Sequence, residues 1–249
     1  MDYYSEHTWK HYDSEGRSLE RLACIKKMIP EDVKIILDAG CGNGIITNEL
    51  ARDYEVTALD LSAIALQYVQ CSKICASIDA IPFPDNSFDL VCSNEVLEHL
   101  DDITLQKGIQ EIKRVSKKYL IIGIPYKEQL EKKFYRCALC GFSENVYSHL
   151  QSFDLSKLDI LLTPDFIRLD YHIFGPLERN IHPFLLSILH KQGQWFLPSE
   201  GQKCPQCGST KFLHKSNILT RMVNGINLII SHPHPYWFYT LYQKKDNIE

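Results

Sequence analysis

The chain contains 249 residues, of which 45% are hydrophobic and 23% are charged, and it carries a formal net charge of −4. Such a composition is typical of a globular protein with a full hydrophobic core, and the acidic balance argues against a large nucleic acid held through its phosphates. No apolar run approaches the ~20 residues that a membrane span needs, and the polar, acidic start of the chain does not have the pattern of an export signal. We therefore expect a cytoplasmic protein without a membrane span, and the sequence leaves the oligomeric state open.

Residues 1–30 are predicted to form an N-terminal arm that ends in a helix. Apolar residues recur at helical spacing between Leu19 and Ile29, which predicts a helix from about residue 15 to residue 29. The arm before this helix is rich in aromatic residues, namely Tyr3, Tyr4, Trp9 and Tyr12. The helix is expected to pack on the body of the protein through its apolar side.

Beyond the arm, short apolar runs alternate with helical stretches. The runs predict strands near residues 33–38, 56–60, 73–78, 88–93 and 118–124. This alternation is typical of an α/β fold with a parallel sheet and helices on both faces. Ligands of such sheets bind at the carboxyl ends of the strands, near the point where the strand order reverses. Functional residues are therefore expected at the strand ends.

A glycine-rich turn lies between the first strand and the next helix, with the sequence Asp38-Ala39-Gly40-Cys41-Gly42-Asn43-Gly44. Three glycines at alternate positions let the backbone turn sharply and approach a ligand closely, which favours a nucleotide-like cofactor. The dinucleotide pattern G-x-G-x-x-G is not met, because Ile45 takes the position of its third glycine. Asp38 would repel phosphates and suit a cationic amino-acid group, so a nicotinamide oxidoreductase is the less favoured alternative.

Three further segments follow the turn in order. Val56 to Asp60 is predicted to be a second strand that ends in an acid about 20 residues after the glycines, where a carboxylate can accept hydrogen bonds from ribose hydroxyls. Next come Ser77-Ile78-Asp79-Ala80-Ile81-Pro82-Phe83-Pro84-Asp85-Asn86-Ser87-Phe88-Asp89-Leu90-Val91 and Cys92-Ser93-Asn94-Glu95-Val96-Leu97-Glu98-His99-Leu100. Together with the turn, these segments resemble the motifs of the class I S-adenosylmethionine-dependent methyltransferases, in particular the type 11-like subfamily.

The resemblance implies a Rossmann-like, doubly wound sheet of seven mostly parallel strands with an antiparallel last strand. It also implies S-adenosylmethionine as the cofactor, with the Asp79 carboxylate accepting from the adenine amino group and the Ala80 backbone N–H donating to the ring. In related methyltransferases an arm such as residues 1–30 covers the cofactor. The cofactor-binding residues predicted in this way are Asp38, Gly40, Cys41, Gly42, Asn43, Gly44, Asp60, Leu61, Asp79, Ala80 and Asn94.

Residues 31–249 are predicted to form the methyltransferase domain, with two interruptions. The regular pattern breaks after Pro125 and resumes at His149, with a helix to Leu162 and a strand from Phe166 to Phe174. It breaks again until the stretch from Tyr236 to Tyr242, which resembles the last antiparallel strand. We therefore place two inserts at residues 126–148 and 175–235.

Each insert carries one C-x-x-C pair followed by a glycine, Cys137/Cys140 in the first and Cys204/Cys207 in the second. Four thiolates fit tetrahedral zinc, and nine cysteines without an export signal favour metal binding over disulfides. In the implied topology both inserts leave the sheet at its ligand-binding end. The pairs are therefore predicted to share one structural Zn²⁺ and to build a small zinc-binding lobe. A redox dithiol and unpaired buried cysteines are the alternatives.

Two histidines are candidates for chemistry at the acceptor. His149 lies where family members often present a histidine, just before the helix that leads to the sixth strand, and would remove or orient the acceptor proton. His99 follows Glu98 at the end of the fourth motif. The alternatives are a helix cap for His149 and a packed helix end for His99. Weaker candidates are His232, His234, Asp102 and Glu98.

The sequence thus predicts an enzyme that transfers a methyl group from S-adenosylmethionine to a hydroxyl or amine of a small molecule, such as a sugar or a natural product. Two alternatives stay open: a methyltransferase that acts on RNA or protein, and a non-catalytic partner protein that binds the cofactor or zinc. The first would need a basic surface that the composition does not indicate. The second would have little need for the intact acids and glycines.

Overall fold

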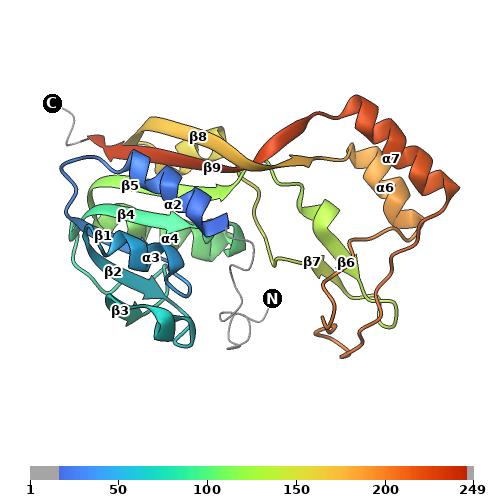
Figure 1. The fold of residues 1–249 in the computed structure, drawn as a ribbon, viewed down its shortest axis with the longest axis horizontal. Helices are drawn as coiled ribbons and strands as arrows, with labels where there is room; N and C mark the ends of the chain where they lie inside the picture. Colours follow the sequence, from blue (N-terminus) through green and yellow to red (C-terminus); the bar gives the residue numbers. More distant parts are fainter. Residues whose placement is uncertain (1–16, 246–249) are drawn as a thin grey trace.

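The structure, a computed structural model, describes residues 17–245, and its body is a seven-stranded sheet in the order β3-β2-β1-β4-β5-β9-β8 (Figure 1). The strands are β1 Ile35–Ala39, β2 Glu55–Asp60, β3 Ser72–Cys75, β4 Phe88–Asn94, β5 Ser116–Pro125, β8 Phe166–Arg179 and β9 Pro233–Lys244. Strands β1 to β5 pair in parallel, whereas β9 is antiparallel to both β5 and β8. This arrangement confirms the predicted Rossmann-like, doubly wound α/β sheet with an antiparallel last strand.

Helices cover both faces of this sheet. Helices α2 (Arg17–Met28) and α3 (Ile45–Leu50) pack on one face, and α4 (Asp102–Val115) and α5 (Leu155–Leu162) pack on the other (Figure 1). Short 3₁₀ helices lie in the connections: η1 Ala65–Tyr68, η2 Leu97–His99 and η3 Leu130–Lys133. Since both faces are covered, the edge formed by the carboxyl ends of the strands is the part of the sheet that can receive a ligand.

The predicted elements of the body agree with the structure apart from their ends. Helix α2 ends one residue before the predicted Ile29, and the four aromatic residues predicted for the arm lie outside the described residues. The third strand ends at Cys75 rather than near residue 78. Strands β8 and β9 are longer than predicted, because their pairing continues to Arg179 and Pro233, inside the region that the sequence marks as the second insert.

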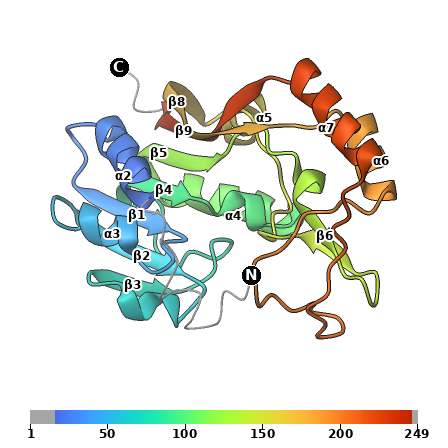
Figure 2. The same cartoon turned by 45° about the vertical axis from the view of Figure 1, so that its right-hand side comes forward.

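Both predicted inserts lie beyond the same edge of the sheet, where they form a lobe (Figures 1 and 2). The first insert contributes η3 and the hairpin of β6 (Phe134–Arg136) and β7 (Ser143–Asn145), and the second contributes α6 (Pro183–Lys191) and α7 (Ile218–Ile230). The inserts are hydrogen-bonded to each other, since Leu213 N donates to Arg136 O at 2.8 Å and Ala138 N donates to Lys211 O at 2.9 Å. No helix within residues 17–245 is long and apolar enough to cross a bilayer.

The contact between β5 and β9 depends on a glycine. A Cβ at Gly123 would lie 2.2 Å from Cζ of Tyr239, a buried ring, so Gly123→Ala forces a shift inside the core. We expect it to lower the free energy of unfolding by about 1–3 kcal/mol, the usual cost of overpacking. Gly225→Ala is the control, because nothing lies within 4 Å of its Cβ and alanine favours the helix α7. Urea unfolding curves that give both variants the same loss would contradict this account.

Candidate active site and cysteine cluster

The glycine-rich turn sits at the carboxyl end of β1 and has the backbone shape that its glycines predict. Gly40, Gly42 and Gly44 all have positive φ, at 87°, 54° and 75°. The turn is fixed to the next strand, since Gly40 N and Cys41 N donate to Leu59 O at 2.7 and 3.0 Å. It also meets the loop after β4, because a Cβ on Gly40 would lie 2.2 Å from Val96. Glycine is therefore required at position 40 by both conformation and space.

The two acids predicted for the cofactor flank this turn. Asp38 is buried and accepts a hydrogen bond of 2.6 Å from the Thr47 hydroxyl. Burial raises the pKa of Asp38 to about 6, although the Thr47 hydrogen bond opposes the shift. At the end of β2, the Asp60 carboxylate accepts from Gly42 N and Ser62 N, both at 2.8 Å. Burial also raises the pKa of Asp60, against these hydrogen bonds. Asp60 thereby holds the turn through Gly42, and Asp38 is joined to helix α3 through Thr47.

The other predicted cofactor residues lie around the same edge in different environments. Asn94 ends β4, and both polar atoms of its amide are buried without a hydrogen-bond partner among the described residues. Asp79 is half-buried and Ala80 exposed. The Ala80 N–H that the sequence assigns to the adenine ring donates to Ser77 O at 3.1 Å. Leu61 is exposed. Buried orphan groups such as Asn94 cost free energy, so a polar ligand at this edge would be stabilised there.

His149 is paired with a carboxylate that the sequence analysis missed. Its Nδ1 lies 2.5 Å from Glu128 Oε2, and both side chains are buried. The same carboxylate lies 3.4 Å from Lys133 Nζ, which is 2.7 Å from Glu178. Burial would raise the pKa of Glu128, but the hydrogen bond and charge of His149 and the charge of Lys133 outweigh it and lower that pKa. Glu128 lies in the first insert outside any motif, so no sequence signal pointed to it.

His99 and Glu98 lie against this pair. The rings of His99 and His149 have centroids 4.7 Å apart, and Glu98, His99 and His149 each offer one ligand atom within 4.8 Å of the others. Both Glu98 carboxylate oxygens are buried without a hydrogen-bond partner within residues 17–245. Burial, with the nearby charge of Glu95, raises the pKa of Glu98. Burial and His149 lower the pKa of His99 to about 3, so that this imidazole is neutral near pH 7.

Backbone contacts hold the histidine loop against the fourth motif. Leu150 N and Gln151 N donate to Glu98 O at 2.7 and 3.0 Å. Two nearby residues that are not glycine, Glu95 and Ser148, have positive φ of 56° and 58°. Such conformations cluster at functional sites because the surrounding structure has to maintain them.

The weaker candidates from the sequence, His234, His232 and Asp102, lie outside the cluster of Glu98, His99 and His149. His234 is half-buried, and its Nε2 has no hydrogen-bond partner in the described part of the chain. Its ring packs edge-on to Tyr126 at 6.0 Å. His232 is exposed. Asp102 accepts from Gln151 Nε2 at 2.7 Å at the start of α4, so it orders the loop beside His149.

The four cysteines of the two C-x-x-C pairs come together as predicted. Their sulfur atoms all lie within 4.8 Å of one another, with 3.6 Å between Cys137 and Cys207 and between Cys140 and Cys204. A disulfide needs about 2.05 Å, whereas tetrahedral zinc with Zn–S bonds of ~2.3 Å separates its sulfurs by ~3.8 Å. The distances therefore match a metal site better than two disulfides.

The turns of the two pairs are built alike. Gly141 N donates to Cys137 O at 3.1 Å and Gly208 N donates to Cys204 O at 2.8 Å, with both glycines at positive φ. Backbone N–H groups of Cys140 and Leu139 donate to the Cys137 sulfur and lower the pKa of its thiol to about 6. Backbone N–H groups at Phe142 and Ser209 would lower the pKa of Cys140 and of Cys207, but desolvation and hydrogen bonds among the thiols raise both. The thiolate, which is the form that binds Zn²⁺, is therefore stabilised at Cys137.

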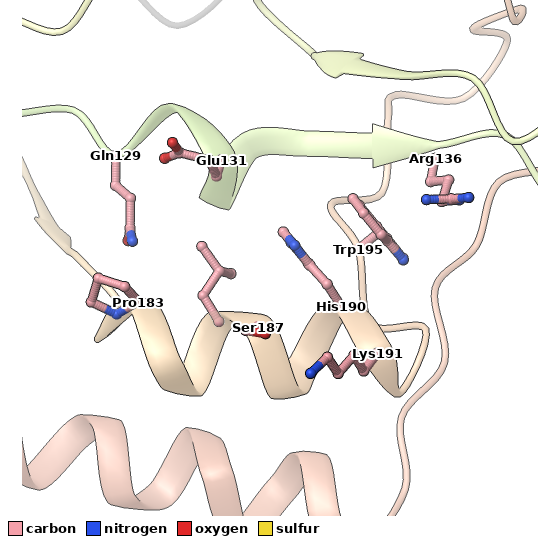
Figure 3. A pocket seen from close by; sticks show the side chains of 9 residues that line it. Gln129, Glu131, Arg136, Pro183, Ser187, His190, Lys191 and Trp195 are labelled. Carbon is pink, nitrogen blue, oxygen red and sulfur yellow. The ribbon is translucent and has the colours of Figure 1, made fainter.

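A hollow of about 530 Å³ lies inside the lobe, between η3 and β6 of the first insert and α6 of the second (Figure 3). Arg136, Lys191 and Trp195 are among the residues that line it. The Trp195 ring stacks on His190 with centroids 4.0 Å apart, and the Arg136 guanidinium lies 5.3 Å from the Trp195 centroid. This hollow is therefore ordered by the packing of both inserts rather than by one of them.

Comparison with known proteins finds a likeness in the centre of the chain. Residues 37–122 match the family model described as a methyltransferase domain. The matched segment, about a third of the chain, is therefore similar to that domain. It holds the glycine-rich turn, Asp60, Asp79, Asn94 and the fourth motif, which are the segments on which the sequence resemblance rests.

Curated relatives align with less than half of the chain. An uncharacterized protein of Methanocaldococcus jannaschii is 37% identical over 113 residues, which are 44% of this chain and 48% of that protein. The malonyl-[acyl-carrier protein] O-methyltransferase of Halorhodospira halophila is 36% identical over 129 residues, 43% of each chain. The chain thus spans about half the length of the curated relatives it matches.

The fold likeness extends over nearly the whole chain. A crystal structure of a SAM-dependent methyltransferase from Archaeoglobus fulgidus covers 98% of this chain and 100% of its own, with a TM-score of 0.59 and 18% identity. At this identity the likeness shows the fold.

Proposed function

We propose that the protein transfers a methyl group from S-adenosylmethionine to a hydroxyl or amine of a small molecule. The observation that best supports this is a continuous line of contacts along the carboxyl edge of the sheet. It runs from Asp60 to the glycine-rich turn, from the turn to Val96, and from Glu98 to the loop that holds His149. A nucleoside site and a buried acid–base pair thereby share one edge, which methyl transfer between two bound molecules requires.

The residues at this edge fit the cofactor. S-adenosylmethionine supplies a methyl group on a sulfonium, so the protein mainly has to position the acceptor and take its proton. The positive-φ glycines allow the backbone to approach the cofactor closely. Asp60 would accept from the ribose hydroxyls, Asp38 would face the cationic amino group, and Asp79 would accept from the adenine amino group. The buried amide of Asn94 has hydrogen-bonding capacity that a polar ligand would satisfy.

A small-molecule acceptor is supported by the hollow in the lobe. Its volume of about 530 Å³ is that of a small-molecule pocket. The charged residues that line it are Arg136, Lys191 and Glu131, so its net charge is positive and would favour a polar or acidic acceptor, such as a sugar derivative or a natural product. An RNA or protein acceptor is the alternative.

Titration calorimetry with S-adenosylmethionine and, in parallel, with NAD tests the cofactor. We expect binding of the former alone, because the turn carries acids where a dinucleotide would place phosphates. Asp60→Ala is expected to weaken the binding of S-adenosylmethionine by about 1.5–3 kcal/mol, the range for hydrogen bonds to a charged group.

Asp170→Ala is a matched control, since Asp170 is an exposed acid of β8 in the body. Tight binding of NAD would refute the cofactor assignment. Equal affinities of the Asp60→Ala variant and the parent protein would refute the ribose contact while leaving the cofactor in place.

His149 would take the proton of the acceptor. Its Nδ1 is held by Glu128, which orients the ring and leaves Nε2 for the acceptor. Glu128 would act as a positioning residue, since it touches the histidine and fixes the orientation of its ring. A histidine in this role typically contributes a factor of 10²–10⁴ to the rate.

The same cluster favours a second way to activate the acceptor. Glu98, His99 and His149 could together hold a divalent cation, which lowers the pKa of a bound hydroxyl. The specific observation in its favour is the buried Glu98 carboxylate without a partner within residues 17–245, because a buried carboxylate is normally paired or metal-bound.

His149→Gln distinguishes these roles when it is combined with chelation. We expect the variant to lose about 10²–10⁴ in kcat with unchanged affinity for S-adenosylmethionine, whereas His172→Gln, an exposed histidine of β8, keeps full activity. Activity of the parent protein that survives EDTA assigns proton transfer to His149. Activity that EDTA abolishes and added Mg²⁺ restores assigns a cation at the cluster. Full activity of His149→Gln would contradict both roles.

We also propose that Cys137, Cys140, Cys204 and Cys207 hold one structural Zn²⁺. The support is the set of sulfur distances and the matching turns. Four thiolates close the coordination sphere, so this ion would stabilise the lobe rather than bind the acceptor. It would join the two inserts across 63 intervening residues.

Cys204→Ser should remove the zinc and loosen the lobe, while the sheet keeps its helix and strand signal in circular dichroism. Zinc content by atomic absorption is expected to fall from about one ion per chain to none. Cys75→Ser is the matched control, because Cys75 is an exposed cysteine outside the cluster. A Cys204→Ser protein that retains a full equivalent of zinc would disprove the shared site.

A further inference from the structure

Helix α7 presents its apolar residues outward. The side chains that it buries against the lobe are Thr220, Val223 and Asn227, two of which are polar. Its exposed side chains are mainly large and apolar, and Ile218 and Ile229 are 78% and 82% exposed. We define the apolar face of α7 as the exposed residues Ile218, Leu219, Met222, Ile226, Leu228, Ile229 and Ile230.

This arrangement reverses that of an ordinary surface helix, which buries its apolar side and exposes its polar side. The helix is well formed, since Asn217 caps it in a reciprocal pair with Thr220. It is ~20 Å long and lies on the outer side of the lobe, with α6 next to it (Figure 1). On α6, Phe184 is also exposed. An apolar surface of this extent indicates an interaction site.

The second insert, which carries this helix, is basic, although the whole chain is acidic. Residues 175–235 contain six Lys or Arg residues and two acidic residues, a net charge of +4 in a chain of −4. The positive residues are Arg179, Lys191, Lys203, Lys211, Lys215 and Arg221. Lys215 precedes α7 and Arg221 lies within it, and both are exposed. The exposed apolar residues and the positive charge therefore belong to the same part of the lobe.

We propose that the apolar face of α7 docks on an anionic lipid surface. A helix of this kind lies in the plane of the membrane interface, with its apolar side chains among the acyl chains and its basic neighbours at the headgroups. The helix is too short to cross a bilayer, so the contact is peripheral. Charge decides between this surface and a second copy of the chain. In a symmetric dimer through α7, Lys215 and Arg221 of the two copies would lie in one interface, and α7 has no acidic residue to pair with them.

A lipid-docking lobe also limits the chemical class of the methyl acceptor, and this part rests on the proposed function. If the lobe lies on a membrane, an acceptor with a lipid tail or other amphiphilic part is presented directly to it. The hollow between the inserts is lined by α6 residues such as Lys191 and His190, and α6 packs on α7. A polar head could then enter the hollow while the apolar part stays in the bilayer.

Vesicle flotation with the full chain tests the docking surface. We expect the protein to float with vesicles of phosphatidylcholine and phosphatidylglycerol in equal parts, and to float less with phosphatidylcholine alone or at high salt. The double variant Ile229→Gln with Met222→Gln should reduce the bound fraction about tenfold. The matched control is Ile103→Gln with Ile160→Gln, which changes two isoleucines of the body that are 71% and 75% exposed.

Each other outcome of this experiment overturns the proposal. Failure of the parent protein to float refutes the lipid surface. Equal loss in the two double variants refutes the role of α7. If the parent protein is a dimer by sedimentation velocity and only the α7 variant is a monomer, a second copy covers the face. Flotation needs neither cofactor nor acceptor, so it stays informative if S-adenosylmethionine binding fails.

Discussion

The position of β9 between β5 and β8 determines where everything else in this protein lies. Because β9 is antiparallel to both neighbours, β5 and β8 point the same way and end at one edge of the sheet. One insert follows β5 and the other joins β8 to β9, so both emerge at that edge. The edge is also where β1, β2 and β4 present the glycine-rich turn, Asp60 and Asn94. One strand pairing thus brings the lobe to the cofactor side.

The buried carboxylates at this edge differ in the direction of their pKa shifts, because their surroundings differ. Burial raises the pKa of Glu95 and of Glu98, whereas His149 and Lys133 keep that of Glu128 low despite its burial. Neighbouring acids with opposite shifts are typical of catalytic sites, because one group stays charged while the other keeps its proton. Glu128 comes from the first insert, and Glu98 from the segment that matches the methyltransferase family model. The contact between His149 and Glu128 therefore exists only when the insert is folded onto the body.

Sequence reasoning succeeded where local pattern and geometry coincide, and it failed where packing decides. Alternating runs fixed the order of the strands, and the three glycines of the turn adopt the positive φ that only glycine accepts easily. The predicted strand ends at Phe174, yet β8 continues through Gly175 and Pro176 with an irregular register. Trp237 packs where a Cβ of Gly175 would lie, at 2.3 Å. Glu128 could not be predicted, because its role arises from the fold of an insert without a motif.

Where α6 and α7 meet, the lobe buries few apolar residues and exposes many. Its stability therefore needs a contribution other than the burial of apolar side chains. The cluster of buried apolar residues between α6 and α7 contains only Leu185, Leu189 and Val223, while seven apolar residues of α7 face outward. A unit with so small a core needs an additional constraint, and small proteins commonly use a metal for it. Four cysteines that link the two inserts supply such a constraint without occupying the surface of α7. On the proposals made here, a metal held by these four cysteines would stabilise the lobe while the apolar face of α7 stays exposed.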